Sequence, residues 1–143
     1  MKKVISSFII ILIVFSVVGC NRMGKTKDAS ITIGKSVKFS KKEIDDAVEC
    51  VKERFKNYKG CTLTDLWYDE NKSNTYVEDY LKYGGGTENG STKENSIVLM
   101  SNFDVDSLGG DGSFEPNSTT DDWQWVLIRD SKTSKWEVIE SGY

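Results

Sequence analysis

The sequence predicts an α+β fold in which an N-terminal helix packs on a curved antiparallel sheet of about four strands, with a second short helix. The first observation is an amphipathic helical pattern over residues 40–58. The second is a set of apolar, β-branched and aromatic runs at 96–105, 122–130 and 136–139, which are typical of strands. A helix followed by consecutive strands is the order of an α+β domain.

The first helix is expected to begin at a capping box. Ser40 is followed three residues later by Glu43, so each side chain can accept a hydrogen bond from the other residue's backbone amide. Gly60 suits the left-handed conformation that ends many helices, so the helix is expected to stop near Tyr58. Its apolar stripe at helical spacing consists of Ile44, Ala47, Val48, Val51, Phe55 and Tyr58.

The elements after the first helix are predicted from shorter sequence patterns. Residues 62–69 are expected to form a strand, and residues 73–83 a short helix that lies on the sheet as an amphipathic lid. The glycine-rich stretch 84–91 is expected to be a loop, and it lacks the residues of a phosphate-binding loop. The last two strands are expected to form a hairpin. One face of strand 122–130 carries Trp123, Trp125, Leu127 and Arg129.

The first twenty residues have the pattern of a bacterial secretion signal. Lys2 and Lys3 precede the apolar run 8–15, and Gly19 stands immediately before Cys20. The run is shorter than the about 20 apolar residues that span a bilayer. The ending resembles a lipobox, in which the cysteine is acylated and the chain is cut before it. We therefore expect a lipoprotein signal peptide at 1–19, with an ordinary cleaved signal or a retained anchor as the alternative.

Acylation of Cys20 would place the protein on the cell membrane, lipid-anchored at its extracytoplasmic face, with the lipid bilayer as its first partner. Residues 20–37 are expected to be a lipidated flexible tether with one short edge strand at 31–33, and residues 38–143 a single α+β domain. Residues 22–42 are basic, with Asp28 as the one acid. They either interact electrostatically with anionic headgroups or form a soluble linker.

Composition excludes several classes of function. The chain has 19 Lys and Arg against 22 Asp and Glu, whereas a nucleic-acid binder would be basic. It contains no histidine, which removes the commonest general base and the commonest zinc ligand. No motif for a serine or cysteine nucleophile occurs. We expect no catalytic residue, cofactor or metal.

Two cysteines remain once Cys20 is acylated. Cys50 and Cys61 lie 11 positions apart in the sequence, on the flank of the first helix and just after its turn. On the oxidising side of a membrane such a pair favours a disulfide. The alternative is two separate buried thiols.

The loop 104–115 partly matches the calcium loop of an EF-hand. Asp104, Asp106, Gly109 and Glu115 occupy matching positions, but Leu108 stands where a side-chain oxygen is needed. A strand also enters this loop where an EF-hand has a helix. A solvated surface loop is therefore the favoured interpretation, with a calcium site as the alternative.

Several segments of the chain also resemble a known protein family. The segments 40–55, 60–63, 67–70, 123–129 and 136–143 resemble a family of small Gram-positive bacterial lipoproteins of unknown function, with a cystatin-like (nuclear transport factor 2-like) domain. This resemblance implies no catalytic residue, because its motifs are aromatic and structural.

Three functions are compatible with the sequence. The first is a non-enzymatic module that binds an unknown protein or small molecule in the concave face of the sheet. The second is an immunity-like or accessory inhibitor lipoprotein, and the third is a small carboxylate-dependent hydrolase or isomerase. Arg129 lies on a largely apolar face, and the favoured interpretation is an edge position from which its head group reaches water. The alternative is that its guanidinium binds a carboxylate or an anionic ligand. The candidate ligand-binding residues are Trp67, Tyr76, Tyr80, Trp123, Trp125 and Arg129.

Overall fold

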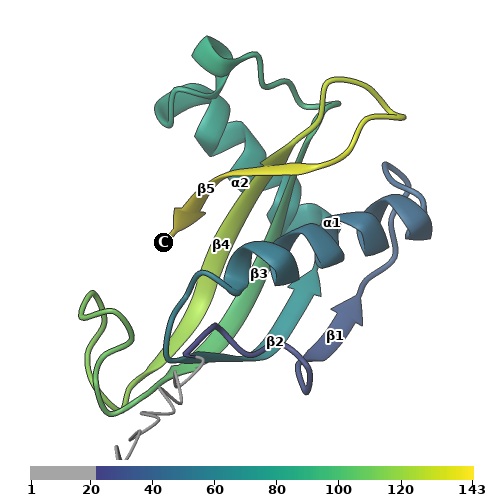
Figure 1. The fold of residues 1–143 in the computed structure, drawn as a ribbon. Coiled ribbons are helices and arrows are strands. Elements are labelled where there is room, and N and C mark those ends of the chain that lie inside the picture. The colour runs from purple at the N-terminus through teal and green to yellow at the C-terminus, as the bar shows by residue number, and fades with distance from the viewer. Residues whose placement is uncertain (1–21) are drawn as a thin grey trace, which may run out of the picture.

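The computed structural model describes residues 22–143. The expected signal peptide and the acylation site Cys20 lie outside these residues. The domain contains five strands, two α-helices and one short 3₁₀ helix (Figure 1). In chain order they are β1 (Ser30–Ile33), α1 (Lys41–Phe55), β2 (Cys61–Tyr68), α2 (Glu70–Tyr83), η1 (Gly86–Asn89), β3 (Ser96–Val105), β4 (Thr119–Ile128) and β5 (Glu137–Gly142).

The strands form one open sheet in the order β1-β2-β3-β4-β5. β2 to β5 pair antiparallel, whereas β1 pairs parallel to β2, with Ser30 opposite Asp65 and Ile33 opposite Tyr68. The predicted α+β class is confirmed. The finer prediction of about four antiparallel strands with an N-terminal helix is not matched exactly, because β1 precedes α1 and adds a fifth, parallel strand to the antiparallel strands β2 to β5.

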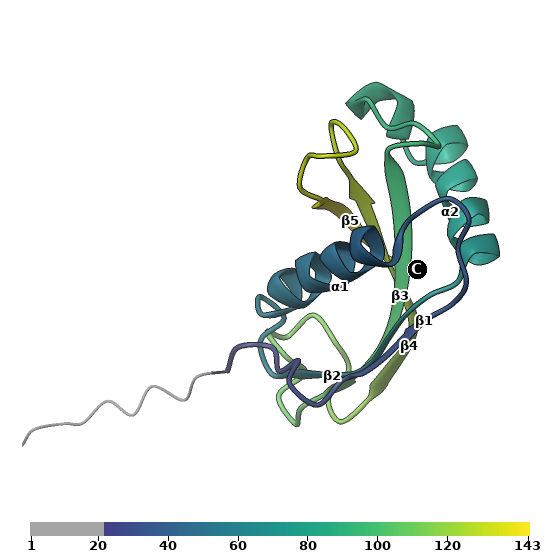
Figure 2. The same ribbon diagram turned by 90° about the vertical axis from the view of Figure 1, so that its right-hand side faces the viewer.

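The two helices lie on opposite faces of the sheet. Figure 2, in which β3 is seen nearly edge-on, places α1 on one side and α2 on the other. α1 connects the parallel strands β1 and β2, and α2 connects the antiparallel strands β2 and β3. The second helix therefore does cover the sheet, but on the face that α1 leaves free.

The main core lies between α1 and the sheet. α1 begins at the predicted capping box: the Ser40 side chain accepts from the Glu43 amide at 3.2 Å, and Glu43 accepts from the Ser40 amide at 2.6 Å. Its buried stripe packs against Leu66, Trp125 and other apolar residues of the strands. The predicted stripe is buried at Ile44, Ala47, Val48, Val51 and Phe55, whereas Tyr58 lies beyond the end of α1 and is half-buried.

A smaller core lies under α2. Val77 and Tyr80 of α2 pack on Val98 of β3 and Val126 of β4. Ser73 adds a buried polar contact, because its hydroxyl oxygen accepts from the Val98 amide at 2.9 Å. α2 is capped by the Asp69 side chain, which accepts from the Lys72 amide.

The segment before β1 makes backbone hydrogen bonds with the domain. The Gly24 amide donates to the Lys56 carbonyl at 3.0 Å, and Lys25 forms a bridge with Thr62 at the start of β2. Gly24 allows this close approach, since a β-carbon there would lie 2.0 Å from the Phe55 carbonyl oxygen. The short edge strand expected at 31–33 is present as β1.

Within residues 22–143, neither α-helix has the length and apolar content needed to cross a bilayer.

Candidate functional site

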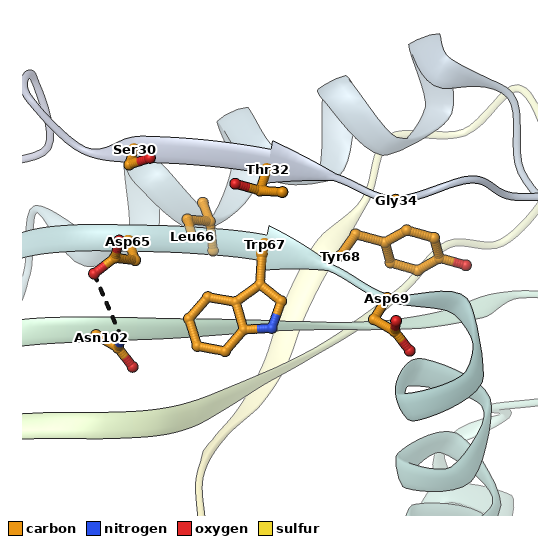
Figure 3. Close-up of a pocket in the computed structure, with 9 residues that line it drawn as sticks. All are labelled: Ser30, Thr32, Gly34, Asp65, Leu66, Trp67, Tyr68, Asp69 and Asn102. Carbon is orange, nitrogen blue, oxygen red and sulfur yellow. Dashed lines mark hydrogen bonds between the residues drawn. The ribbon is translucent and has the colours of Figure 1, made fainter.

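A shallow groove of about 370 Å³ opens on the face that carries α2, over the part of β1, β2 and β3 that α2 leaves uncovered. The alternation of β2 explains its lining. Leu66 and Tyr68 point into the core under α1, so Asp65, Trp67 and Asp69 point to the opposite face. Figure 3 shows the Trp67 indole projecting between the two aspartates.

Several polar side chains surround the Trp67 ring in the groove. Its wall on β1 includes Ser30 and Thr32, which pair with Asp65 and Trp67 respectively. Asn102 on β3 donates from its amide nitrogen to Asp65 at 3.4 Å (Figure 3). Trp67 is half-buried and lines the groove, so part of the residue is accessible there.

The carboxylates of the groove have hydrogen-bond donors but no cation. Asp65 also accepts from the Thr64 hydroxyl at 2.9 Å, and Asp69 accepts from the Lys72 amide at 2.8 Å. Neither takes part in an ion pair among the residues that the structure describes. The groove therefore presents negative charge beside an accessible aromatic face.

The six candidate ligand-binding residues do not form one site. Trp67, Tyr76 and Tyr80 lie on the α2 side, whereas Trp123, Trp125 and Arg129 lie on the α1 side. Tyr76 and Tyr80 pack in the small core under α2, so of the six only Trp67 lines the groove. The candidates are therefore divided between the two faces of the sheet, and α1 covers one of these faces with its apolar stripe.

Trp125 is a core residue. Its ring is fully buried, and its indole nitrogen donates to the Ser101 hydroxyl at 2.8 Å. It contacts Phe55 of α1 edge to face, with ring centroids 6.2 Å apart. These contacts make Trp125 part of the packing between α1 and the sheet.

Arg129 forms its ion pair with Glu43 of the same domain. It is 5% exposed, and its guanidinium donates to Glu43 at 2.6 Å and to the Lys132 carbonyl at 3.2 Å. It also lies over the Trp136 ring, 4.3 Å from the centroid. The favoured interpretation, a head group that reaches water from an edge position, is wrong, because the guanidinium is buried against Glu43. The Ser40 amide and then Arg129 lower the pKa of Glu43 to about 2.

Trp123 borders a second cavity, of about 250 Å³, together with Tyr58, Phe114 and residues of the loops around them. The Trp123 ring makes edge contacts with Phe103 and Tyr143, at centroid distances of 5.7 and 5.1 Å. Its indole nitrogen is buried and has no hydrogen-bond acceptor among residues 22–143. Because that N–H is buried away from solvent, it is not accessible to a ligand in the cavity.

The expected disulfide is absent from the described structure, in which Cys50 and Cys61 are free thiols. Cys50 donates from Sγ to the Trp136 carbonyl at 3.2 Å, and Cys61 is buried at the start of β2. Burial raises the pKa of both thiols, that of Cys61 to about 11, and Asp106 adds to the effect at Cys61. Such thiols are poor nucleophiles.

In the loop between β3 and β4, the Asp106 side chain accepts hydrogen bonds from backbone amides of the same loop. Asp106 Oδ1 accepts from the amides of Leu108 and Gly110, at 3.1 and 3.0 Å, and Oδ2 accepts from Arg22 at 2.9 Å. Asp104 lies on β3 and accepts from the Thr119 hydroxyl. The described residues contain no cluster of His, Cys, Asp and Glu that would hold a metal ion.

Comparisons with known proteins give no functional assignment: no family model, curated protein or solved structure matches this chain.

Proposed function

We propose that this protein is a lipid-anchored binding module of the extracytoplasmic face, and that the groove around Trp67 holds a cationic group of its ligand. The observation that carries the proposal is the position of the Trp67 ring between Asp65 and Asp69 on an uncovered sheet face. Both carboxylates lack a cationic partner within residues 22–143.

The chemistry of the groove selects an amine or a guanidinium. An ammonium or guanidinium group over an indole face is attracted by the ring quadrupole, by about 0.5–1 kcal/mol at an exposed site. Asp65 and Asp69 lie on either side of the ring, so either carboxylate can add a charge-assisted hydrogen bond to a cationic group bound there. The groove is open and shallow, which favours a side chain presented by a partner, such as lysine, over an enclosed small molecule.

The contacts of Arg129 favour binding over hydrolysis. A carboxylate-dependent hydrolase on the α1 side would need an acid and Arg129 facing an open cavity, but Glu43 already caps α1 and pairs with Arg129. Asp106 is likewise engaged by Arg22, which leaves less free charge in the loop for an inhibitor to use. We therefore propose a non-enzymatic role.

Titration of the full chain with tetralysine tests the binding proposal. We expect tetralysine to change the tryptophan fluorescence at low salt, tetraglutamate to have no effect, and high salt to weaken the response. Trp67→Ala and Asp65→Asn should each lose most of the affinity. Tyr83→Ala, which removes a ring that is 74% exposed outside the groove, is the matched control and should bind normally. Equal affinity of Trp67→Ala and wild type for tetralysine would contradict the proposal.

Membrane fractionation tests the anchor separately. Cys20→Ala should release the protein from membranes or leave the uncleaved precursor, whereas Cys50→Ala should stay attached. Continued acylation of Cys20→Ala would contradict the lipid anchor and leave the groove proposal standing.

A further inference from the structure

The chain is fixed to the domain from its first described residue. The Arg22 guanidinium donates to Asp106 at 2.9 Å and to the Gly110 carbonyl at 2.6 Å, and the Arg22 carbonyl accepts from the Gly60 amide at 2.7 Å. Gly24 and Lys25 then continue this attachment to α1 and β2. Arg22 therefore has a defined place at one end of the domain, beside the loop between β3 and β4.

This attachment leaves almost no spacer after the acylated cysteine of the proposed function. Only Asn21 separates Cys20 from Arg22. Two extended residues span about 7 Å, so the acylated residue and Arg22 are within that reach of one another. A domain held this closely cannot rotate freely above the bilayer, since the same end must always face the headgroups.

Exposed apolar side chains are present at that end. Met23 is 48% exposed, and Leu108 is 65% exposed near the tip of the loop that Arg22 contacts on both sides, at Asp106 and Gly110. In Figure 1 the start of the coloured chain and this loop lie at the lower end of the domain, away from η1 at the upper end. Large apolar side chains exposed beside a membrane anchor suit the interface of a bilayer.

The charges at this end are mixed. The exposed lysines Lys25, Lys27 and Lys59 lie among exposed acids, which include Asp28, Asp104, Asp111 and Glu115. The ion pair of Arg22 with Asp106 is internal to the domain. The contact with lipid would therefore depend on the short link and the apolar side chains more than on anionic headgroups.

We infer that this end of the domain is a membrane-facing surface, whose occupant is the lipid bilayer and whose inserted side chains are Met23 and Leu108. The inference rests on the lipid anchor of the proposed function. The opposite end, which carries η1 and the exposed Tyr83 of α2, points away from the membrane. The groove around Trp67 then opens on the side of the domain, between the two ends.

Hydroxyl-radical footprinting of the lipidated full chain in vesicles tests this surface. The vesicles contain equal parts of phosphatidylcholine and phosphatidylglycerol, and the reference is a variant with ten Gly and Ser residues inserted between Asn21 and Arg22. We expect the oxidation rates of Met23 and Leu108 to be severalfold lower in the wild type than in the insertion variant. Tyr83 should be oxidised equally in both, because it is exposed and distant from the lipid.

Vesicle flotation in the same samples separates the two proposals. If the protein floats but Met23 and Leu108 are oxidised as fast as in the insertion variant, the membrane-facing surface is wrong while the anchor stands. If the wild type does not float, the anchor is wrong and the inference fails with it. A second variant, Leu108→Asp, should still float but should raise the oxidation rate of Met23 towards that of the insertion variant.

Discussion

The two faces of the sheet use the same strands but are covered to very different extents. Under α1, 18 buried residues form one continuous core, whereas under α2 four buried residues form the second. α1 lies across the sheet with its apolar stripe, and α2 covers mainly β3 and β4. The uncovered remainder of the α2 face is where the polar groove around Trp67 opens. A single sheet thus separates a face that is covered by the main core from a face that is only partly covered.

The two tryptophans Trp125 and Trp67 give the sharpest test of this comparison. Trp125→Ala removes a fully buried ring and should lower the free energy of unfolding by about 3–5 kcal/mol. Trp67→Ala, on the open face, should lower it by no more than about 1 kcal/mol. Urea unfolding followed by circular dichroism measures both. Equal losses would contradict the division of the faces.

Two adjacent residues of β4 allow the contributions of the two faces to stability to be compared at one place in the sheet. Leu127 lies in the α1 core and Val126 in the α2 core. Leu127→Ala should cost about 2–5 kcal/mol in unfolding free energy, and Val126→Ala about 1.5 kcal/mol, since less apolar volume is lost. Thermal and urea denaturation of the two variants compare them. A larger loss for Val126→Ala would reverse the assignment of the main core.

The ion pair on the α1 face predicts a pH dependence. Because the native pKa of Glu43 is about 2 and lies below its unfolded value, its stabilisation is complete above about pH 5 and is lost as the pH falls towards 2. Glu43→Gln should cost about 1.5–3 kcal/mol at neutral pH, and the difference from wild type should shrink over that range.

Urea unfolding measured from pH 7 to pH 2 follows this difference. Glu49→Gln, on the exposed side of the same helix, is the control and should change stability little. A constant difference between Glu43→Gln and wild type across the range would contradict the role of the ion pair.

The smallest effect is expected where the segment before β1 joins the domain. Arg22→Ala should leave the unfolding transition in place, because the ion pair with Asp106 is partly exposed. It should nevertheless speed tryptic cleavage after Lys25 and Lys27 severalfold, since the segment detaches more often. Cleavage after Lys93 serves as the internal reference, and Lys35→Ala as the control variant. Unchanged cleavage would show that Arg22 does not hold the segment.

Local patterns in the sequence predicted the elements that pack by their own side chains. The capping box at Ser40, the stripe of α1 and the bounds of β3 agree with the structure. The alternation along β4 also placed Trp125 and Arg129 on one face correctly. Such predictions succeed because amphipathic periodicity is dictated by which face of an element is buried.

Contacts between distant parts of the chain could not be predicted in this way. The edge strand β1 was predicted, but its parallel pairing with β2, which follows it only after α1, was not. The partner of Arg129 is Glu43, 86 positions earlier, and nothing local in the sequence signals the pair. The side of the sheet that α2 covers follows from the chain path, and it separates residues that were expected to act together.

The parallel pairing of β1 with β2 has a mechanical consequence. Both strands run away from the end of the domain where Arg22 is attached, so a pull on the chain at Arg22 acts along the axis of β1. The hydrogen bonds between the two strands lie across that axis and are loaded together in shear rather than opened one after another. The hydrogen bonds between β1 and β2 therefore act together to resist a force applied at Arg22.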